Sequence, residues 1–201
     1  MLLRTITALS AVLTAVLFFC SDLALWLLPL LFMGFWLVLL LAAFLVLLAF
    51  SEAVDLEKPQ GEDSKLYRKV MHLYIEALIA LVGAKIETAG LEKTPKEGRF
   101  LLVCNHQNES DPGILLHYFK NSQLAFISKR ENKTMLVVGK FMHKISCQLV
   151  NRENDREALK TILRCIQILK EDKASIGVFP EGGIKDKDKL SPFRSGVLKI
   201  A

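Results

Sequence analysis

Charge is almost absent from the first quarter of this 201-residue sequence. Residues 1–50 contain two charged side chains, Arg4 and Asp22, among long runs of Leu, Phe, Val and Ala. Such a segment cannot form the surface of a water-soluble domain, and it exceeds the roughly 20 apolar residues that cross a bilayer. We do not expect a cleaved signal peptide, because the apolar region of a signal peptide is much shorter.

Two apolar stretches make up this segment. Leu23–Phe50 carries no charge and is long enough to span a membrane with some tilt. Ile6–Cys20 is shorter, and Ser21–Asp22 separates the two as a turn. We therefore expect a transmembrane helical hairpin over residues 1–50, with a single span as the alternative.

The net charge of +5 belongs to the rest of the chain, because Arg4 and Asp22 cancel. A mildly basic domain beside a membrane suits an anionic lipid surface, where each Lys or Arg gains about 1 kcal/mol. An ordinary mixed surface is the alternative. Arg4 and the cations of residues 58–69 flank the hairpin on one side. The positive-inside rule then predicts a domain on the cytoplasmic face of the cell membrane.

Cysteines are few, and the sequence contains no internal repeat or low-complexity tract. The spacing of the four cysteines fits no metal site or redox pair, and three of them lie in apolar runs, where cysteine acts as a small hydrophobe. They are Cys20, Cys104, Cys147 and Cys165. Disulfide-rich and zinc-finger classes are therefore disfavoured, and a reducing, cytoplasmic environment is expected.

Beyond a polar linker at residues 51–64, helical and strand-like segments alternate. We expect helices over residues 65–83, 134–143 and 155–170 and from Asp111 onward, and strands over 84–89, 100–104, 124–128, 145–150 and 175–179. This alternation predicts an α/β domain over residues 65–201, with a mixed, mostly parallel sheet flanked by helices. In such sheets, ligands bind beyond the carboxyl ends of the strands.

A polar motif, N-H-Q-N-E-S-D, follows the strand expected at 100–104. With His106 at the strand end and Asp111 in the first turn of the next helix, the carboxylate can reach back to the imidazole. The other ring nitrogen can then take a proton from a hydroxyl, as in a catalytic triad whose hydroxyl comes from the substrate. A structural pair is the alternative. Metal ligation is disfavoured, because His117 and His143 lie in other elements.

N-H-x-x-x-x-D after one apolar strand, with F-P-E-G at 179–182 after another, resembles the glycerolipid acyltransferase family, typified by bacterial 1-acyl-glycerol-3-phosphate acyltransferases. The resemblance covers about residues 80–201 and includes G-L-E-K at 90–93 and P-F-R-S-G at 192–196. It implies transfer of a fatty acyl group to the hydroxyl of 1-acyl-glycerol-3-phosphate in phospholipid biosynthesis. Acyl-CoA or acyl carrier protein would be the co-substrate, with no metal or redox cofactor. The implied partners include membrane lipids and exclude nucleic acid.

The resemblance also implies roles for particular residues. His106 would be the catalytic base and Asp111 the residue that orients it. Arg152 would bind the acceptor phosphate, which suits a planar guanidinium, and Glu181 and Gly182 would bind the glycerol phosphate. The implied substrate-binding residues are Asn105, Lys129, Arg152, Glu181 and Gly182, and Gly139 would match the glycine of the family's second block.

The chain departs from the family pattern in three places. The family usually follows F-P-E-G with Ser or Thr and then Arg, where this chain has Gly183 and Ile184. Another lysophospholipid or an amino-acid lipid is therefore the alternative acceptor, unless Lys185 or Arg194 supplies the missing cation. The second block also lacks its usual proline. Family members continue beyond Ala201 with a further strand, so the resemblance implies an incomplete C-terminus and leaves open a non-catalytic, lipid-binding relative.

Overall fold

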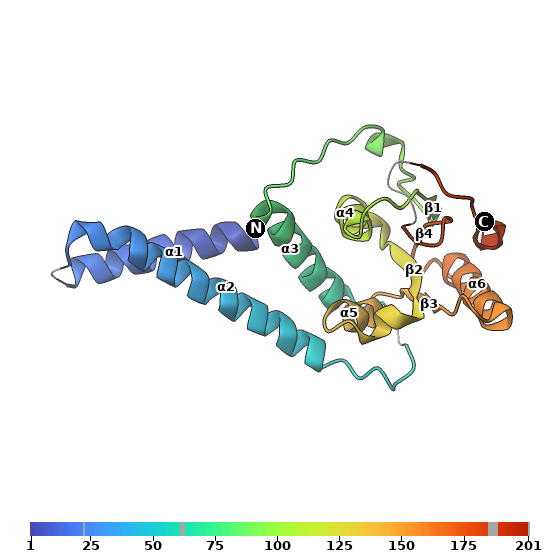
Figure 1. Cartoon of the computed structure of the whole chain (residues 1–201), viewed down its shortest axis with the longest axis horizontal. Coiled ribbons are helices and arrows are strands. Elements are labelled where there is room, and N and C mark those ends of the chain that lie inside the picture. Colours follow the sequence, from blue (N-terminus) through green and yellow to red (C-terminus); the bar gives the residue numbers. More distant parts are fainter. Residues whose placement is uncertain (22, 61–62, 185–188, 201) are drawn as a thin grey trace. The chain divides into compact units, whose positions relative to one another are not determined.

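A computed structural model of the chain describes all residues except Asp22, Gly61–Glu62, 185–188 and Ala201 (Figure 1). The chain forms two compact units. One consists of Met1–Ala53 with Leu73–Lys85, and the other of Val54–His72 with Ile86–Ala201.

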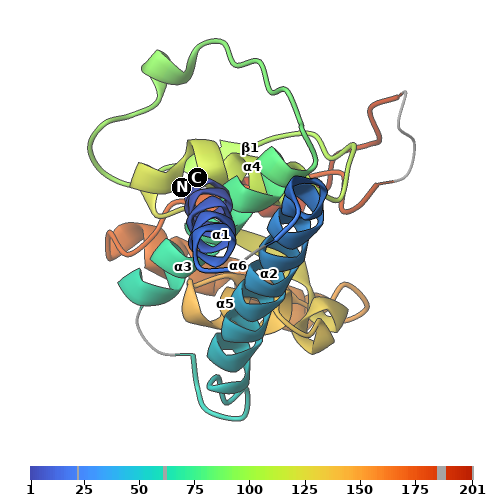
Figure 2. The ribbon, with the colours of Figure 1, turned by 90° about the vertical axis from the view of Figure 1, so that its left-hand side faces the viewer.

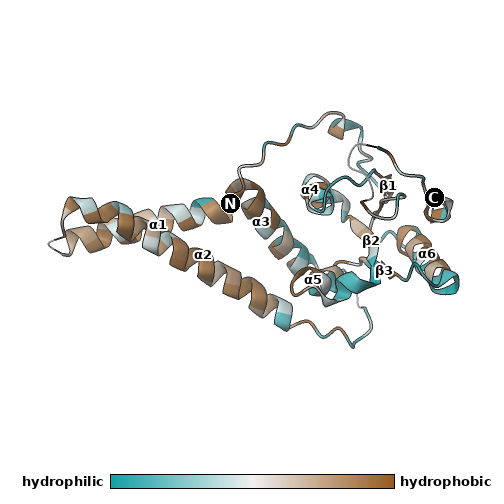
Figure 3. Ribbon diagram, in the orientation of Figure 1, coloured by the Kyte–Doolittle hydropathy of each residue, from teal (hydrophilic) through white to brown (hydrophobic). Residues whose placement is uncertain are grey.

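The first unit is built mainly from two apolar helices, α1 (Leu2–Phe19) and α2 (Leu28–Glu52), the latter preceded by a 3-10 turn, Leu25–Leu27. They lie side by side in both views (Figures 1 and 2). Both are long and apolar enough to cross a membrane. Hydrophobic residues make up most of α2, whereas less hydrophobic turns interrupt α1 (Figure 3). The two helices of the expected hairpin are therefore candidate membrane spans.

Polar side chains in this unit are satisfied locally. The hydroxyls of Ser10 and Thr14 are buried and donate to the carbonyls of Ile6 and Ser10, each at 2.8 Å. The indole N–H of Trp36 in α2 donates to the Thr7 hydroxyl in α1 at 3.2 Å. Each of these three donors therefore has a hydrogen-bond partner, which lowers the cost of placing it in an apolar environment.

Helix α3 (Lys65–Leu81) contributes residues to both units. Its second part belongs to the first unit, where the Tyr74 hydroxyl donates to the Ala43 carbonyl of α2 at 2.6 Å. The Glu76 carboxylate forms an ion pair with the terminal amine of Met1. Both contacts hold the end of α3 to the apolar helices.

The second unit contains a four-stranded sheet in the order β1-β4-β2-β3. The three pairings among the described residues are all parallel, which confirms the α/β class. The strands are β1 (Leu101–Val103), β2 (Ala125–Lys129), β3 (Gln148–Val150) and β4 (Ile176–Val178). The helices between them are α4 (Asp111–Tyr118), α5 (Val138–Lys144) and α6 (Asp155–Lys170). Because the strands are parallel, the segments after β1 and β4 leave the sheet at the same edge.

The core of this unit consists of strand residues, the segments that lead into β2 and β3, and the inner face of α6. Buried side chains include Leu124, Phe126, Ile145, Cys147, Cys165, Ile168, Ile176 and Val178. Helix α6 begins where the sequence predicts, because the Asn154 side chain accepts a hydrogen bond from the Glu157 amide as an N-cap. Cys165 and Ile168 of this helix are buried in the core, whereas Leu159 and Leu163 are exposed.

Three expected elements differ in the structure. The strand expected at 145–150 begins only at Gln148, because Ile145 caps α5 and Ser146 has a positive φ of 63°. The strand expected at 84–89 is wrong: these described residues form no strand, and the pairings of the sheet involve only β1 to β4.

The helix expected at 134–143 begins later, after a 3-10 turn at Arg130–Thr134. A Cβ atom on Gly139 would lie 2.2 Å from the Lys133 carbonyl oxygen, so α5 lies directly against this turn.

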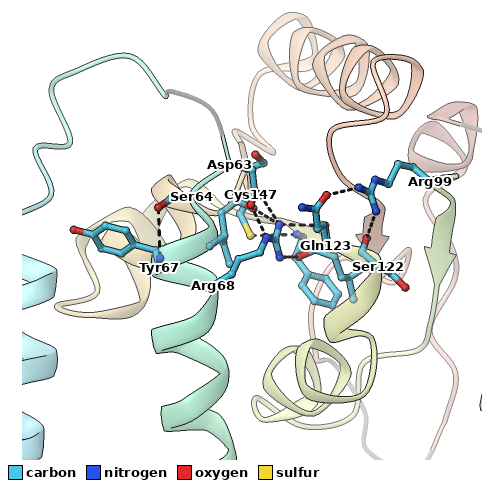
Figure 4. A network of polar contacts seen from close by, with 12 residues as sticks. Asp63, Ser64, Tyr67, Arg68, Arg99, Ser122, Gln123 and Cys147 are labelled. Atoms are coloured by element: carbon cyan, nitrogen blue, oxygen red, sulfur yellow. Dashed lines mark hydrogen bonds and ion pairs between the residues drawn. The ribbon is translucent and has the colours of Figure 1, made fainter. Parts of the chain in front are cut away.

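The first part of α3 is fixed to the second unit by Arg68, which is 5% exposed (Figure 4). Its guanidinium donates to both carboxylate oxygens of Asp63, at 2.6 and 2.5 Å. It also donates to the carbonyls of Leu124 at 2.7 Å and Ile145 at 3.0 Å. A buried charge is tolerated when it is paired and fully hydrogen-bonded, so Arg68 joins α3 to the segments that enter β2 and β3.

Candidate active site

The site begins where β1 leaves the sheet. Beyond Val103, the Cys104 amide still donates to the Val178 carbonyl of β4 at 3.1 Å, and the chain then leaves the ladder. Helix α4 begins at Asp111, with Pro112 in its first turn, where no amide donor is needed. His106 and Asp111 are therefore held at the two ends of one short loop.

The imidazole of His106 meets the carboxylate of Asp111, as expected from the spacing. Nδ1 of His106 lies 3.0 Å from Oδ2 of Asp111, and the two side chains are 17% and 24% exposed. A carboxylate can only accept, so Nδ1 carries the hydrogen and Nε2 keeps its lone pair. This arrangement fixes one tautomer of the imidazole.

Asp111 is also bonded to the loop that it closes. The same oxygen, Oδ2, accepts from the amides of Gln107 and Asn108, each at 2.8 Å. Burial raises the pKa of the Asp111 carboxyl, but the hydrogen bonds from Asn108, the His106 side chain and Gln107 outweigh it, and the pKa lies below its ordinary value. The carboxylate is thus ionised at neutral pH.

Glu181 connects the F-P-E-G segment to the histidine loop. Its side chain is buried, with 2% of the residue exposed. Oε1 accepts from the His106 amide and Oε2 from the Ser191 amide, each at 2.9 Å. The amides of Ser191 and His106 lower the pKa of this carboxyl. Both carboxylate oxygens therefore accept hydrogen bonds from backbone amides, which the sequence did not predict. The role of Glu181 in acceptor binding stays a prediction.

One aromatic ring stacks directly on the imidazole, and a second ring stacks on the first. The ring of Phe179 stacks on the His106 ring, with centroids 4.2 Å apart and planes 22° apart. Phe126 of β2 stacks on Phe179 at 5.3 Å and 6°. Sequence reasoning missed Phe179 as a functional residue; its place directly before Pro180-Glu181 was the available signal.

Two cations lie at the glycine turn after Glu181. The Arg152 guanidinium donates to the Gly182 carbonyl. A Cβ on Gly183 would lie 3.6 Å from Nη1 of Arg152, and a Cβ on Gly182 would lie 2.9 Å from Nε of Arg194. Burial and the nearby Arg194 lower the pKa of Arg152. The turn therefore carries two guanidinium groups.

The turn also accounts for one departure from the family pattern. Gly182 and Gly183 have φ angles of 76° and 138°, values that side chains other than glycine rarely adopt. A Ser or Thr at 183 would be strained in this backbone. The amide of Arg194 donates to the Pro180 carbonyl at 2.8 Å, which places a cation at the turn although Ile184 replaces the usual arginine.

The other predicted site residues have fewer contacts with the site around His106. Asn105 and Lys129 are exposed, at the ends of β1 and β2 respectively, and no described contact joins them to the His106–Asp111 pair. Gly139 lies against the 3-10 turn before α5. Lys185 lies outside the described residues.

Comparison with known proteins identifies the family of the chain. The model of the family described as Acyltransferase matches residues 85–201. This match covers more than half of the sequence, and the chain belongs to the acyltransferase family.

Individual relatives have names that are more specific than the description of the family. The chain is 30% identical over 172 residues to a probable 1-acyl-sn-glycerol-3-phosphate acyltransferase of Mycoplasma pneumoniae, covering 82% of this chain and 64% of that protein. It is 27% identical to a 1-acyl-sn-glycerol-3-phosphate acyltransferase of Borreliella burgdorferi, covering 66% and 52%. A chloroplastic 1-acyl-sn-glycerol-3-phosphate acyltransferase of Brassica napus is 30% identical, covering 67% and 40%. The chain thus spans between two fifths and two thirds of the length of these relatives.

Proposed function

We propose that this chain transfers a fatty acyl group from a thioester to the free hydroxyl of 1-acyl-glycerol-3-phosphate, in phospholipid biosynthesis. The contact between His106 and Asp111 carries the proposal, because it prepares a general base at the ligand edge of the sheet in a member of the acyltransferase family. The names of the relatives support this acceptor.

In the proposed reaction, Nε2 of His106 accepts the proton of the acceptor hydroxyl. The hydroxyl oxygen then forms a bond to the thioester carbonyl carbon, and Asp111 stabilises the imidazolium. When the tetrahedral intermediate collapses, the carbon–sulfur bond breaks, and the imidazolium returns the proton to the leaving thiolate. The products are an ester and a free thiol, and no metal or redox cofactor takes part.

The acceptor phosphate is assigned to Arg152 and Arg194. Two guanidinium groups beside the Gly182–Gly183 turn provide paired, planar donors, which match the oxygens of a phosphate monoester. An anion there would also relieve the repulsion between two neighbouring cations. In this assignment Arg194 supplies the cation that Ile184 lacks.

The acyl donor is assigned to acyl-CoA or acyl carrier protein, both of which carry the fatty acid as a thioester. The candidate membrane helices α1 and α2 support a location at the membrane, where the lysophospholipid acceptor resides. The cations on one side of the predicted hairpin support a catalytic domain on the cytoplasmic face of the cell membrane.

The test is acyl transfer to 1-acyl-glycerol-3-phosphate by the full chain in detergent or vesicles. His106→Ala should reduce transfer to background with the fold retained. His117→Ala is a matched control, because that imidazole lies in α4 and contacts Tyr118. Unchanged turnover in His106→Ala would reject His106 as the base.

A second acceptor class is favoured by one feature, the Gly183–Ile184 pair in place of Ser/Thr–Arg. Another lysophospholipid or an amino-acid lipid would then replace the phosphate monoester. Direct competition between these acceptors separates the two classes: a preference for 1-acyl-glycerol-3-phosphate supports the main proposal, and indifference to a free phosphate monoester supports the second.

A further inference from the structure

The geometry points to Phe179 as a positioning residue, which sets the plane of the His106 ring through a column of stacked aromatic rings supported by Gly177. This inference rests on the proposed function in one respect, that His106 is the base. The column itself is a structural feature that can be tested without any activity.

Hydrogen bonds alone do not fix the plane of the imidazole. The His106 amide is held by Glu181, and Nδ1 is held by Asp111 at 3.0 Å. With a single bond at Nδ1, the ring can still turn about its Cβ–Cγ bond within the range of angles that the hydrogen bond tolerates. The face of Phe179, 4.2 Å from the His106 centroid and 22° from its plane, removes this freedom. The direction of the Nε2 lone pair therefore depends on Phe179.

Phe179 is itself held by the sheet. It directly follows β4 and precedes the fully buried Pro180. Phe126 stacks on it with planes only 6° apart. Phe126 is 5% exposed, and its amide bonds to Sγ of Cys147 at 3.2 Å, so this ring has little freedom to move.

Gly177 leaves the space that the Phe126 ring occupies. The two residues are register partners on neighbouring strands β2 and β4. A Cβ on Gly177 would lie 2.4 Å from Cε1 and 2.7 Å from Cδ1 of the Phe126 ring. The ring therefore lies over the glycine, and any side chain at position 177 would push it away. The sheet thus fixes the plane of the Phe126 ring. Phe126 fixes the plane of the Phe179 ring, and Phe179 fixes the plane of the imidazole.

The proposed column makes a specific kinetic prediction. Misplacing a catalytic group by about 1 Å can cost 100-fold in rate, while substrate binding does not use the plane of the ring. Phe179→Leu, which keeps the apolar volume but removes the flat face, should lower kcat by about 10- to 100-fold. KM for the acceptor should change far less, and Phe179→Tyr should restore kcat.

The direct readout is the NMR spectrum of isotope-labelled histidine in the full chain. Stacking on Phe179 should shift the carbon-bound ring protons of His106 upfield, and Phe179→Leu should abolish this shift. Phe100→Leu is the matched control: Phe100 contacts Phe119 edge-on, with centroids 6.1 Å apart, at the opposite end of β1. This control should leave both kcat and the His106 signals unchanged.

Gly177→Ala provides a second test that keeps all three rings. The new methyl group should displace Phe126, alter the His106 signals and lower kcat in the same direction as Phe179→Leu. Wild-type signals and wild-type kcat in both variants would overturn the inference. If instead His106→Ala kept full activity while the upfield shift still depended on Phe179, the proposed function would fail and the column would stand.

Discussion

Oε1 of Glu181 accepts a hydrogen bond from the backbone amide of His106 at 2.9 Å, across 75 residues of sequence. The other oxygen accepts from the Ser191 amide at the same distance. A buried carboxylate that accepts two amide donors is satisfied without a counter-ion. Glu181 therefore fixes the main chain that carries the imidazole.

Replacing Glu181 by Gln should separate a positioning role from acceptor binding. The amide group of Gln presents a donor to one of the two backbone amides, so the histidine loop should shift. We expect kcat to fall by about 10- to 100-fold with a small change in KM for the acceptor. Steady-state kinetics over a range of acceptor concentrations provides the measurement. A rise in KM at unchanged kcat would instead assign Glu181 to uniform binding of the acceptor.

Replacing Asp111 by Asn should lower kcat by about 100-fold or more, because the amide can favour the wrong tautomer of His106 and cannot stabilise an imidazolium. Single-turnover acyl transfer in the wild type and the variant tests this expectation. Wild-type rates in Asp111→Asn would show that the pair is structural.

Asp111 should also contribute to stability in a pH-dependent way. Its pKa in the folded chain lies below the value of about 3.9 in an unfolded chain. The carboxylate therefore stabilises the fold above about pH 4, and this contribution is lost as the pH falls through the folded pKa. The difference in unfolding temperature between wild type and Asp111→Asn should shrink below about pH 4. An unchanged difference at pH 3 would contradict this.

Arg194→Ala should weaken acceptor binding if Arg194 replaces the missing cation after F-P-E-G. We expect KM for 1-acyl-glycerol-3-phosphate to rise about 10-fold or more, since a charged hydrogen bond to phosphate contributes about 1.5–3 kcal/mol. Arg194→Lys should restore part of the loss. Arg156→Ala, at an exposed position of α6, is the matched control. Equal KM values in Arg194→Ala and the control would remove Arg194 from the phosphate site.

His72 should make the fold sensitive to mild acid. Neither ring nitrogen has a hydrogen-bond partner among the described residues. Burial, with the nearby charges of Arg68, His117 and Lys120, lowers the pKa of His72 to about 4. The unfolded chain, with a pKa near 6.5, therefore takes up the proton first, and stability falls as the pH drops from about 6.5 toward 4.

The variant His72→Leu tests this linkage. It should lack this part of the acid sensitivity, so that wild type loses stability relative to it between pH 7.5 and 4.5. Thermal unfolding in detergent at the two pH values provides the measurement. Parallel pH profiles for the two chains would show that His72 is not the sensitive group.

The sequence predicts those features that depend on local pattern. Helix α6 has an amphipathic period and an N-cap at Asn154, and its predicted bounds match the structure. The contact between His106 and Asp111 spans a single loop, so spacing alone anticipates it. Such features need no knowledge of what packs against them.

Features that depend on long-range contacts were not predictable. The bridge from Glu181 to His106 and the stack of Phe179 on His106 exist only because β4 lies beside β1. The apolar pattern also does not reveal the 3-10 turn before α5 or the approach of Gly139 to the Lys133 carbonyl. In each case the sequence indicates that the residue is unusual, but it does not indicate which residue it contacts.

The bridge made by Glu181 has a consequence for the order of events during synthesis. The histidine loop cannot reach its final geometry until the ribosome has added the 75 residues that lead to Glu181. At about 5–20 residues per second, this delay is roughly 4–15 s. The apolar helices α1 and α2 are made well before then, so a nascent chain can engage the bilayer long before it is able to carry out chemistry.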